Sequence, residues 1–545
     1  MSTICESLVT RSIFYTPLEL DCYEDPFIKN ILSEFALMQK SLKSSQLLDL
    51  CRSRLLSRIF SRCEHKINGF GRICLIADVF RGGLGDVVSL FKIKDCLTKN
   101  FSNVEIISYL PEYMELRLRS VFDQTILENV RFIDFDNQEK SSLGRADIVI
   151  AGPALLKDYF SWFSVVESAF AFFEYGFTEE VLKFKRFVSL DWDSSVQIIS
   201  TGLNPYEFGI FTSDYLHRQA CLIAEGNVSK ASFVDQLIDG EPSFSHFFRQ
   251  SCFLEGKEPF LCYVYDRKPM FCISDEEYFD KDCSYADSFL YLILKKERFS
   301  DSQIDLICIG DYLLEDDESF EDELLLPGWL SLDDQFLSSM GIDLVEYWQE
   351  DEEVPYHSIN IDCDTHYGKT LRIYFKKTCK KSSMDSLMLL TDDFTCITGD
   401  QSLSEAISAR KLFLYQLLLW KMPLFISFFQ LTEDEDLKNY FRCFYTSSLE
   451  KYFNAKISAR RDGRSQECLL YPTVSKRQFE SEMDQFLIYL EDPEFLLKMK
   501  NFCDEIYENH SFQEYLKGIV IQSFLQIESP YLLAQIFDDI MNTLN

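Results

Sequence analysis

The chain has 545 residues, which is too long for one hydrophobic core and suggests two or three domains. Hydrophobic residues make up 47% and charged residues 26%, as expected of folded globular domains. The 88 acidic and 54 basic residues give a formal net charge of -34, which disfavours nucleic acid and anionic membrane surfaces as partners. Small anions are not excluded, because salt screens the field of distant charges beyond about 10 Å.

Residues 1–10 lack the basic region and apolar core of an export signal. No uncharged apolar run approaches the ~20 residues that are needed to span a bilayer. The 18 cysteines show no C-x-x-C motif and no Cys/His spacing typical of a metal site. We therefore expect a cytoplasmic protein with free thiols and without a membrane span.

Residues 1–68 carry apolar side chains at helical spacing, which predicts a helical N-terminal segment. At 73–77 the pattern changes to a short continuous apolar run, typical of a strand buried on both faces of a parallel sheet. A glycine-rich turn, an amphipathic helix over 87–97 and a second strand over 104–109 follow. This order predicts a βαβ unit at the start of a Rossmann-like domain.

The first Rossmann-like domain is expected over residues 69–225. Further strands are predicted at 146–151 and 208–211, and an apolar helix is predicted over 159–173 between them.

A second Rossmann-like domain is expected over residues 226–430, because short apolar strands again alternate with helical lengths. The predicted strands lie at 260–265, 304–309, 371–375, 394–398 and 412–415. The stretch 311–353 interrupts this series with runs of Asp and Glu, and we expect it to be a solvated acidic insertion. Residues 431–545 are predicted to form a helical C-terminal region.

A glycine turn follows the first predicted strand, at the position where backbone can approach a substrate closely. Its sequence is Gly82-Gly83-Leu84-Gly85-Asp86-Val87, and it lacks the G-x-G-x-x-G spacing of a dinucleotide site. Asp86 falls at the expected start of the helix, where its carboxylate has two possible roles. It can cap the free N–H groups of the helix, or it can act on a substrate.

This turn resembles the N-terminal glycine loop of bacterial glycogen and starch synthases, which have the GT-B fold of two Rossmann-like domains facing a cleft. Those enzymes carry a Lys two residues before the first glycine, whereas this chain has Phe80 there and Arg81 one position later. The layout of Asp78 followed by Gly85-Asp86 is also similar to bacterial protein-arginine rhamnosyltransferases. That resemblance implies Asp86 as the catalytic base, with the glycine loop (Gly82, Gly83 and Gly85) beside the donor.

A second strand-turn-helix phrase covers residues 394–407 and places Gly399, Asp400, Gln401 and Ser402 at a predicted helix N-terminus. Backbone N–H groups and a hydroxyl at such a position can bind a diphosphate. Glu405, one turn further, is within reach of ribose hydroxyls. An alternative interpretation is a capping box, in which Ser402 and Glu405 satisfy backbone donors of the helix.

The phrase Gly-Asp-Gln-Ser-x-x-Glu-Ala resembles the donor-site turn of GT-B enzymes, including the Gly-acidic-x-Ser pattern of the arginine rhamnosyltransferases. The motifs that carry the resemblance comprise about twenty residues. The predicted order of strands and helices resembles the GT-B fold over residues 70–430. The resemblance implies that the second domain binds a nucleotide-sugar donor without a metal ion. Arg267 and Lys268 follow the first strand of that domain, where a cation can neutralise the pyrophosphate.

Other residue motifs in the sequence do not support a different catalytic activity. Asp362-Cys363-Asp364 forms a D-x-D metal motif, but the same pattern occurs at 134–136 and 191–193 in this acidic chain. Gly368-Lys369-Thr370 lacks the preceding glycine of a P-loop. The six histidines form no i,i+4 pair, and no G-x-S-x-G elbow is present.

These patterns predict an α/β protein with two Rossmann-like domains facing a cleft and helical N- and C-terminal extensions. The predicted activity is a metal-independent, inverting glycosyltransferase that needs no cofactor. It moves a sugar from a nucleotide-sugar to a protein or glycan acceptor. The alternative is a non-catalytic scaffold that binds a protein partner through its helical ends, because a fold does not by itself specify chemistry.

Overall fold

The computed structural model describes residues 72–78, 85–98, 101, 103–109, 130–132, 142–152, 159–173, 196–203, 209–250, 253, 256–266, 271–275, 278–300, 303–311, 334–350, 352–362, 368–417, 422–444, 449 and 473–528. The chain forms two compact units, one of residues 1–212 with 509–545 and one of residues 213–508. We call them unit 1 and unit 2. The predicted N-terminal helical segment and four candidate site residues, Gly82, Gly83, Arg267 and Lys268, lie outside the described residues.

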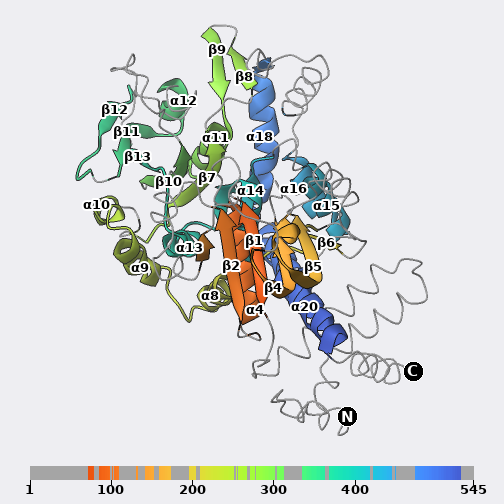
Figure 1. The fold of residues 1–545 in the computed structure, drawn as a ribbon. Helices are drawn as coiled ribbons and strands as arrows, with labels where there is room; N and C mark the ends of the chain where they lie inside the picture. Colours follow the sequence, from red (N-terminus) through yellow and green to blue (C-terminus); the bar gives the residue numbers. More distant parts are fainter. Residues whose placement is uncertain are drawn as a thin grey trace. The chain divides into compact units, whose positions relative to one another are not determined.

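Unit 1 contains a six-stranded sheet in which every neighbouring pair of strands is parallel (Figure 1). Its strands are β1 Ile73–Asp78, β2 Val104–Tyr109, β3 Val130–Phe132, β4 Arg145–Ala151, β5 Val165–Phe173 and β6 Val196–Ser200. The order β3-β2-β1-β4-β5-β6 is the 3-2-1-4-5-6 order of a Rossmann sheet. The predictions for β1, β2 and β4 are therefore confirmed.

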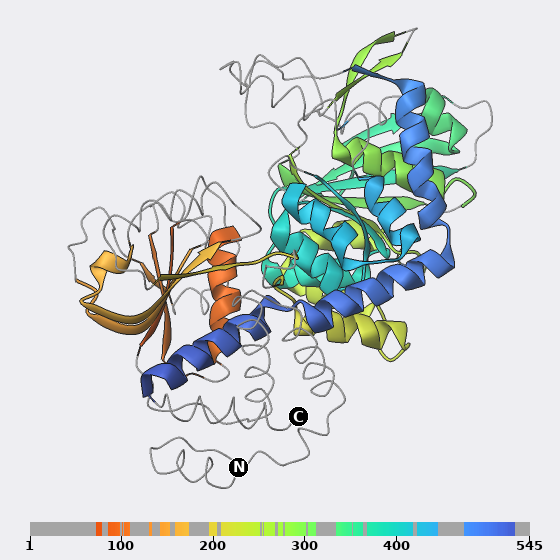
Figure 2. The ribbon, with the colours of Figure 1, turned by 90° about the vertical axis from the view of Figure 1, so that its right-hand side faces the viewer.

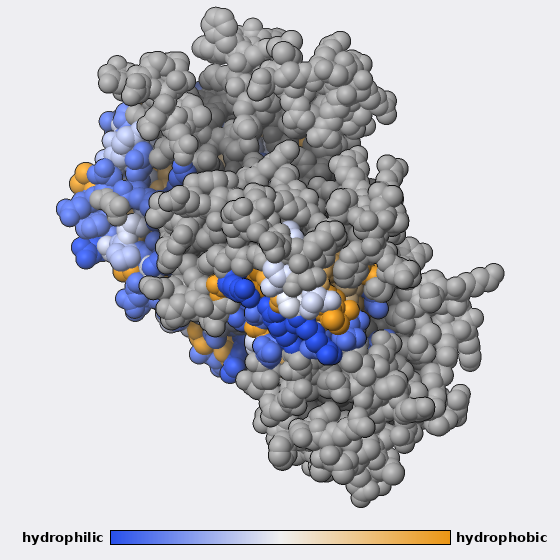
Figure 3. Space-filling view, viewed as in Figure 1, coloured by the Kyte–Doolittle hydropathy of each residue, from blue (hydrophilic) through white to orange (hydrophobic). Residues whose placement is uncertain are grey.

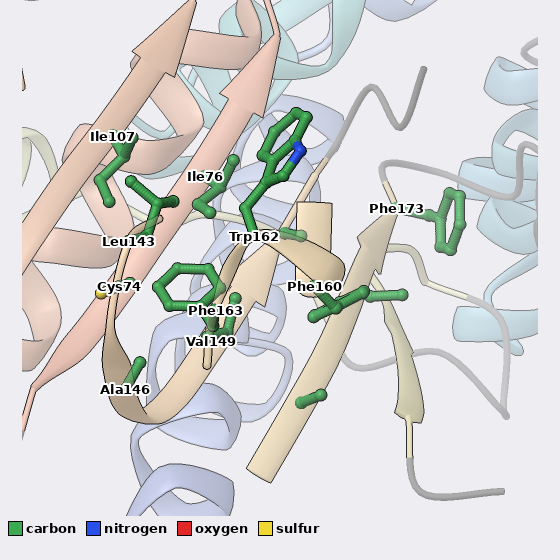
Figure 4. Packing of buried hydrophobic residues seen from close by; sticks show 13 residues of the cluster. Cys74, Ile76, Ile107, Leu143, Ala146, Val149, Phe160, Trp162, Phe163 and Phe173 are labelled. Carbon is green, nitrogen blue, oxygen red and sulfur yellow. The ribbon is translucent and has the colours of Figure 1, made fainter. Parts of the chain in front are cut away.

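Helix α4, Gly85–Thr98, follows β1 and packs against β1 and β2. The C-terminal helix α20, Phe512–Glu528, runs beside α4 (Figure 2). On the sheet, Trp162 and Phe163 pack among buried residues of β1 and β4 such as Ile76 and Val149 (Figure 4). These side chains are at least nine-tenths buried, so a continuous apolar core fixes the positions of the strand ends in unit 1.

Two predictions for unit 1 are wrong. The segment 159–173 is a short 3-10 turn, η3 Tyr159–Trp162, followed by the nine-residue strand β5 instead of one helix. Its continuous apolar sequence does not distinguish a buried helix from a buried strand, and its Val and Phe residues favour the strand. The segment 208–211 makes only isolated bridges from Gly209 and Ile210, and the sixth strand is β6.

Unit 2 contains a seven-stranded sheet in the order β12-β11-β13-β10-β7-β14-β15. Its strands are β7 Phe260–Asp266, β10 Ile304–Asp311, β11 Ile342–Gln349, β12 His357–Asn360, β13 Lys369–Lys376, β14 Phe394–Ile397 and β15 Leu412–Tyr415. Only β12 is antiparallel to its neighbour among these strands. The run β13-β10-β7-β14-β15 has the 3-2-1-4-5 order of a Rossmann sheet, so the five predicted strands are confirmed.

The prediction that 311–353 is a solvated insertion is wrong for its C-terminal part. Strand β11 lies in the sheet between β12 and β13, and its Val345, Tyr347 and Trp348 are fully buried. Burial of each of these large apolar side chains stabilises the fold by about 1.5–3 kcal/mol. This gain outweighs the preference of the neighbouring acidic residues in the sequence for solvent. Residues 342–349 of this stretch therefore extend the sheet toward its β12 edge.

The helices of unit 2 cover this sheet. They are α8 Asp214–Ala224, α9 Ser232–Gly240, α10 Phe244–Arg249, α11 Tyr285–Lys296, α12 Asp334–Ser339, α13 Lys381–Leu390, α14 Gly399–Ser408, α15 Met422–Leu431, α16 Glu435–Arg442, α18 Lys476–Leu490 and α19 Pro493–Asn509.

A small separate sheet, in the order β16-β8-β9, joins Thr473–Ser475, Phe271–Asp275 and Tyr278–Cys283. Mostly hydrophilic residues cover the region of β12 and α10 in the view of Figure 3. Among the described helices, none combines the length and apolar character needed to cross a bilayer.

Candidate functional site

The candidate donor site lies in unit 2 where the strand order reverses. Strands β7 and β14 are parallel neighbours at this switch point, and Ile397 at the end of β14 pairs with Tyr263 of β7. Ligands of open α/β sheets bind outside the carboxyl ends of strands at such a point. Helix α14 begins at Gly399, directly after β14 and Thr398, so its N-terminus lies at this edge.

Gly399 has a backbone conformation that explains the glycine. Its φ is +76°, in the left-handed region that side chains with a Cβ rarely adopt. A Cβ built at this position would meet no atom within 4 Å, so open space lies beside the backbone. The first turn of α14 is therefore accessible on the side of Gly399, where a ligand can approach the helix N-terminus.

Two buried hydroxyl groups at this edge have no hydrogen-bond partner among the described residues. Thr398 is the N-cap residue of α14 and is 8% exposed, yet its side chain makes no capping hydrogen bond. Tyr415, at the carboxyl end of the adjacent strand β15, is fully buried and its hydroxyl is also unpaired. Buried polar groups are normally hydrogen-bonded, so these two point to a water molecule or a ligand at the site.

The hydroxyl of Tyr415 stays protonated at physiological pH. Burial raises the pKa of Tyr415 well above its ordinary value, and the nearby Asp400 carboxylate raises it further. Asp400 is itself buried in the first turn of α14. The edge therefore offers a fixed O–H donor beside the positive end of a helix dipole.

The capping box that the sequence allowed does not form. The helix begins three residues before Ser402, and the Ser402 hydroxyl donates to the carbonyl oxygen of Thr398 within the first turn. Ser402 is 1% exposed and Glu405 is 5% exposed. Both side chains are thus engaged inside unit 2, and Gly399 and Gln401 are the partly exposed residues among 399–402.

Glu405 pairs with Lys381, a residue that sequence reasoning missed. The carboxylate of Glu405 lies 3.2 Å from the Lys381 ammonium, which also contacts Asp385. Lys381 is the first residue of α13, and Lys376 is the last residue of β13; Lys377 and Lys380 lie in the short segment between them. Four lysines within six residues at the end of a buried strand were the available sequence signal for cations at this edge.

The candidate base lies in unit 1 at the corresponding position. Gly85 and Asp86 form the first turn of α4, after β1 and the glycine turn. Strands β1 and β4 are the neighbours at the switch point of this sheet. Gly152, directly after β4, donates its N–H to the carbonyl of Ile76 at 2.8 Å and has a φ of +140°. Sequence reasoning did not identify Gly152, although it occupies the same sheet edge.

Comparison with known proteins places the chain in no family. No protein-family model matches the chain, and no curated protein matches it. Among solved structures it is similar to a glycosyltransferase from Rickettsia africae ESF-5, with 9% identity and a TM-score of 0.37 over 84% of this chain and 100% of that chain. It is also similar to the N-terminal domain of trehalose-6-phosphate phosphatase from Candida albicans, with 10% identity and a TM-score of 0.32 over 84% of this chain and 97% of that chain. Likenesses at this level do not assign a ligand or a reaction.

Within the part of the chain that the structure describes, no group of three or more His, Cys, Asp or Glu side chains is placed to hold a metal ion. Of the D-x-D motif at 362–364, the structure describes only Asp362. The candidate donor site thus consists of a helix N-terminus, two buried hydroxyls and a lysine-containing segment. These are groups that bind a diphosphate by hydrogen bonding and charge.

Proposed function

We propose that the chain is a nucleotide-sugar-dependent glycosyltransferase of the GT-B type, with the donor bound by unit 2 and the acceptor by unit 1. The observation that carries the proposal is the left-handed Gly399 at the switch point of unit 2, beside the unpaired hydroxyls of Thr398 and Tyr415. The motif around Gly399 resembles the donor turn of GT-B enzymes, and both sheets have the Rossmann strand order.

In this proposal, backbone N–H groups of Gly399, Asp400 and Gln401 bind the nucleotide diphosphate. Ser402 holds the first turn through its hydrogen bond to Thr398, and the Glu405–Lys381 pair joins α14 to α13. Arg267 and Lys268 are proposed to reach the pyrophosphate from the loop after β7, together with the glycine loop of unit 1. The positive end of the α14 dipole takes the role that a metal ion has in other transferases.

The proposed reaction is inverting transfer with Asp86 as general base. Asp86 accepts the proton of an acceptor hydroxyl or amide-type nitrogen while that atom forms a bond to the anomeric carbon. The bond from this carbon to the nucleotide diphosphate breaks, and the diphosphate leaves with the electron pair. The acceptor is a protein or a glycan, and the proposed compartment is the cytoplasm.

A thermal-shift screen against nucleoside diphosphates and their sugars tests the proposal. A ligand at 100 times its dissociation constant adds about 2.7 kcal/mol of stability, which raises the melting temperature measurably. We expect one base to give the largest shift and chelators to leave that shift unchanged. Failure of every nucleotide to shift the transition would contradict the proposal and favour the non-catalytic scaffold.

A further inference from the structure

A second cavity in unit 2 lies at the opposite edge of the same sheet. It has a volume of about 380 Å³ and is lined in part by Phe394 and Leu412, the first residues of β14 and β15. Strand β14 has four residues, so its two ends lie about 10 Å apart at a rise of about 3.3 Å per residue, and Gly399 lies beyond the far end. The volume falls within the range of about 300–1,000 Å³ that is typical of small-molecule sites.

The lining of this cavity carries more positive than negative charge, although the chain has a net charge of -34. It contains four lysines and three carboxylates from six separate parts of unit 2. They are Lys230, Lys296, Lys411, Lys500, Glu258, Asp392 and Asp393. Arg410 also lines the cavity, but its guanidinium pairs with Asp504 at 2.8 Å.

The three carboxylates are already bound to three of the lysines. Lys230 lies 2.5 Å from Glu258 and 3.4 Å from Asp393. Lys500 lies 2.6 Å from the other oxygen of Asp393. Lys296 lies 2.9 Å from Asp392. One lysine of the set, Lys411, therefore remains without a carboxylate partner.

Lys411 is held in place by backbone carbonyl groups. Its ammonium donates to the carbonyls of Thr391 at 2.7 Å and of Asp392 at 2.9 Å, and the side chain is 2% exposed. An ammonium group has three N–H donors, and the described residues supply acceptors for two of them, so one donor is left for a ligand in the cavity. Burial lowers the pKa of Lys411 to about 7, Lys230 acts in the same direction, and Asp393 and Asp392 oppose them. A bound anion would favour its charged form.

The remaining wall of the cavity is apolar. Leu389, Leu490 and Leu496 contribute to it from α13, α18 and the start of α19. A ligand that fits this lining has an anionic group at the Lys411 end and an apolar part against the leucines. We propose that the cavity binds a small organic phosphate, with its phosphate on Lys411 and its carbon skeleton on the leucine wall. A phosphate has several acceptor oxygens, and lysine binds phosphate as a point charge.

Isothermal titration with phenyl phosphate tests this proposal, because the probe combines a phosphate with an apolar ring. We expect saturable binding to the full-length protein at about pH 6, and weakening of about tenfold or more in Lys411→Met. The control Lys438→Met removes a lysine on α16 that does not line the cavity and should leave binding unchanged.

A second pair of variants keeps every charge and alters the cavity volume. Leu496→Trp should fill part of the cavity and abolish binding, whereas Leu497→Trp alters the adjacent, 58% exposed position and should not. Gly399→Ala separates the two sites, since phenyl phosphate binding should persist in that variant while nucleotide binding is lost. Equal binding by the wild type, Lys411→Met and Leu496→Trp, or no binding by the wild type, would overturn the proposal.

Discussion

The carboxylate of Glu405 lies 3.2 Å from the ammonium of Lys381, although the two residues are on different helices. Burial alone would lower the pKa of Lys381, but the carboxylates of Glu405 and Asp385 outweigh it and raise the pKa. The stabilisation is therefore complete below the ordinary pKa of lysine and is lost only as the pH rises through the raised value. At neutral pH this pair joins α13 to α14 beside the candidate donor site.

Replacing Glu405 by Gln should therefore destabilise unit 2 by about 1–3 kcal/mol at pH 7, because Lys381 loses one of its two carboxylates in a buried setting. Urea denaturation measures this loss. Glu435→Gln provides the control, since Glu435 pairs with Lys438 at the exposed surface of α16, and we expect no measurable change. If Glu405→Gln were as stable as the wild type, the contact between Glu405 and Lys381 would make no measurable contribution to the stability of unit 2.

Gly399→Ala should cost about 1–2 kcal/mol, because alanine is disfavoured at a φ of +76°. Gly226→Ala is a matched control in the same unit, with a φ of +73° and no atom within 4 Å of an added Cβ. Both variants should lose similar stability in denaturant titrations. Only Gly399→Ala should also lose nucleotide-diphosphate binding, and retention of binding in both would remove Gly399 from the donor site.

The strands that the sequence predicted are short apolar runs with clear ends. The runs at 260–265 and 304–309 are examples, because burial on both faces leaves no polar alternation to confuse the assignment. Strand β5 was mistaken for a helix for the same reason, since an apolar run has no diagnostic period. Strand β11 was not predicted, because the acidic runs beside it in the sequence indicated a solvated segment. Three of its side chains are nevertheless buried.

The candidate site was predictable as a position but not as a set of contacts. The glycine and the helix start at Gly399 follow from local sequence, because a glycine between a strand and a helix permits a positive φ. The pairing of Lys381 with Glu405 depends on the packing of α13 against α14, which no local pattern encodes. The same holds for the cavity at Lys411, whose lysines come from distant parts of the chain.

Gly152→Ala should destabilise unit 1 strongly. An added Cβ would overlap the carbonyl oxygen of Phe172 on β5, and the φ of +140° also disfavours a side chain. Separation of β4 from β5 to relieve this overlap should cost about 3 kcal/mol or more. Gly144→Ala has a φ of +73° and free space around the added Cβ, so it should cost only about 1–2 kcal/mol. Equal melting temperatures for the two variants would contradict this prediction.

Lys411 should make stability depend on pH in the neutral to alkaline range. Its pKa of about 7 in the folded protein lies below the ordinary lysine value, so above pH 7 the unfolded chain binds more protons. Stability contributed by this group therefore rises from pH 7 toward pH 10, by at most about 1.4 kcal/mol per pH unit. Urea titrations across this range should show a steeper rise for the wild type than for Lys411→Met. Parallel curves for the two proteins would show that Lys411 is not titrating near pH 7.

Asp86→Asn tests the proposed base against a purely structural role. Asp86 lies in the first turn of α4, where Asn retains the size and much of the capping capacity of Asp. The variant should therefore melt within a few degrees of the wild type and still bind the donor, because the donor site is assigned to unit 2.

If Asp86 removes the acceptor proton, the variant should lose about 10²- to 10⁴-fold in turnover, which is the usual contribution of a general base. Transfer from the donor identified by thermal shift measures this loss, and the anomeric configuration of the product tests inversion. A normal rate in a normally folded Asp86→Asn protein would leave Asp86 as a helix cap only. Loss of rate together with loss of donor binding would instead indicate that Asp86 itself contributes to donor binding.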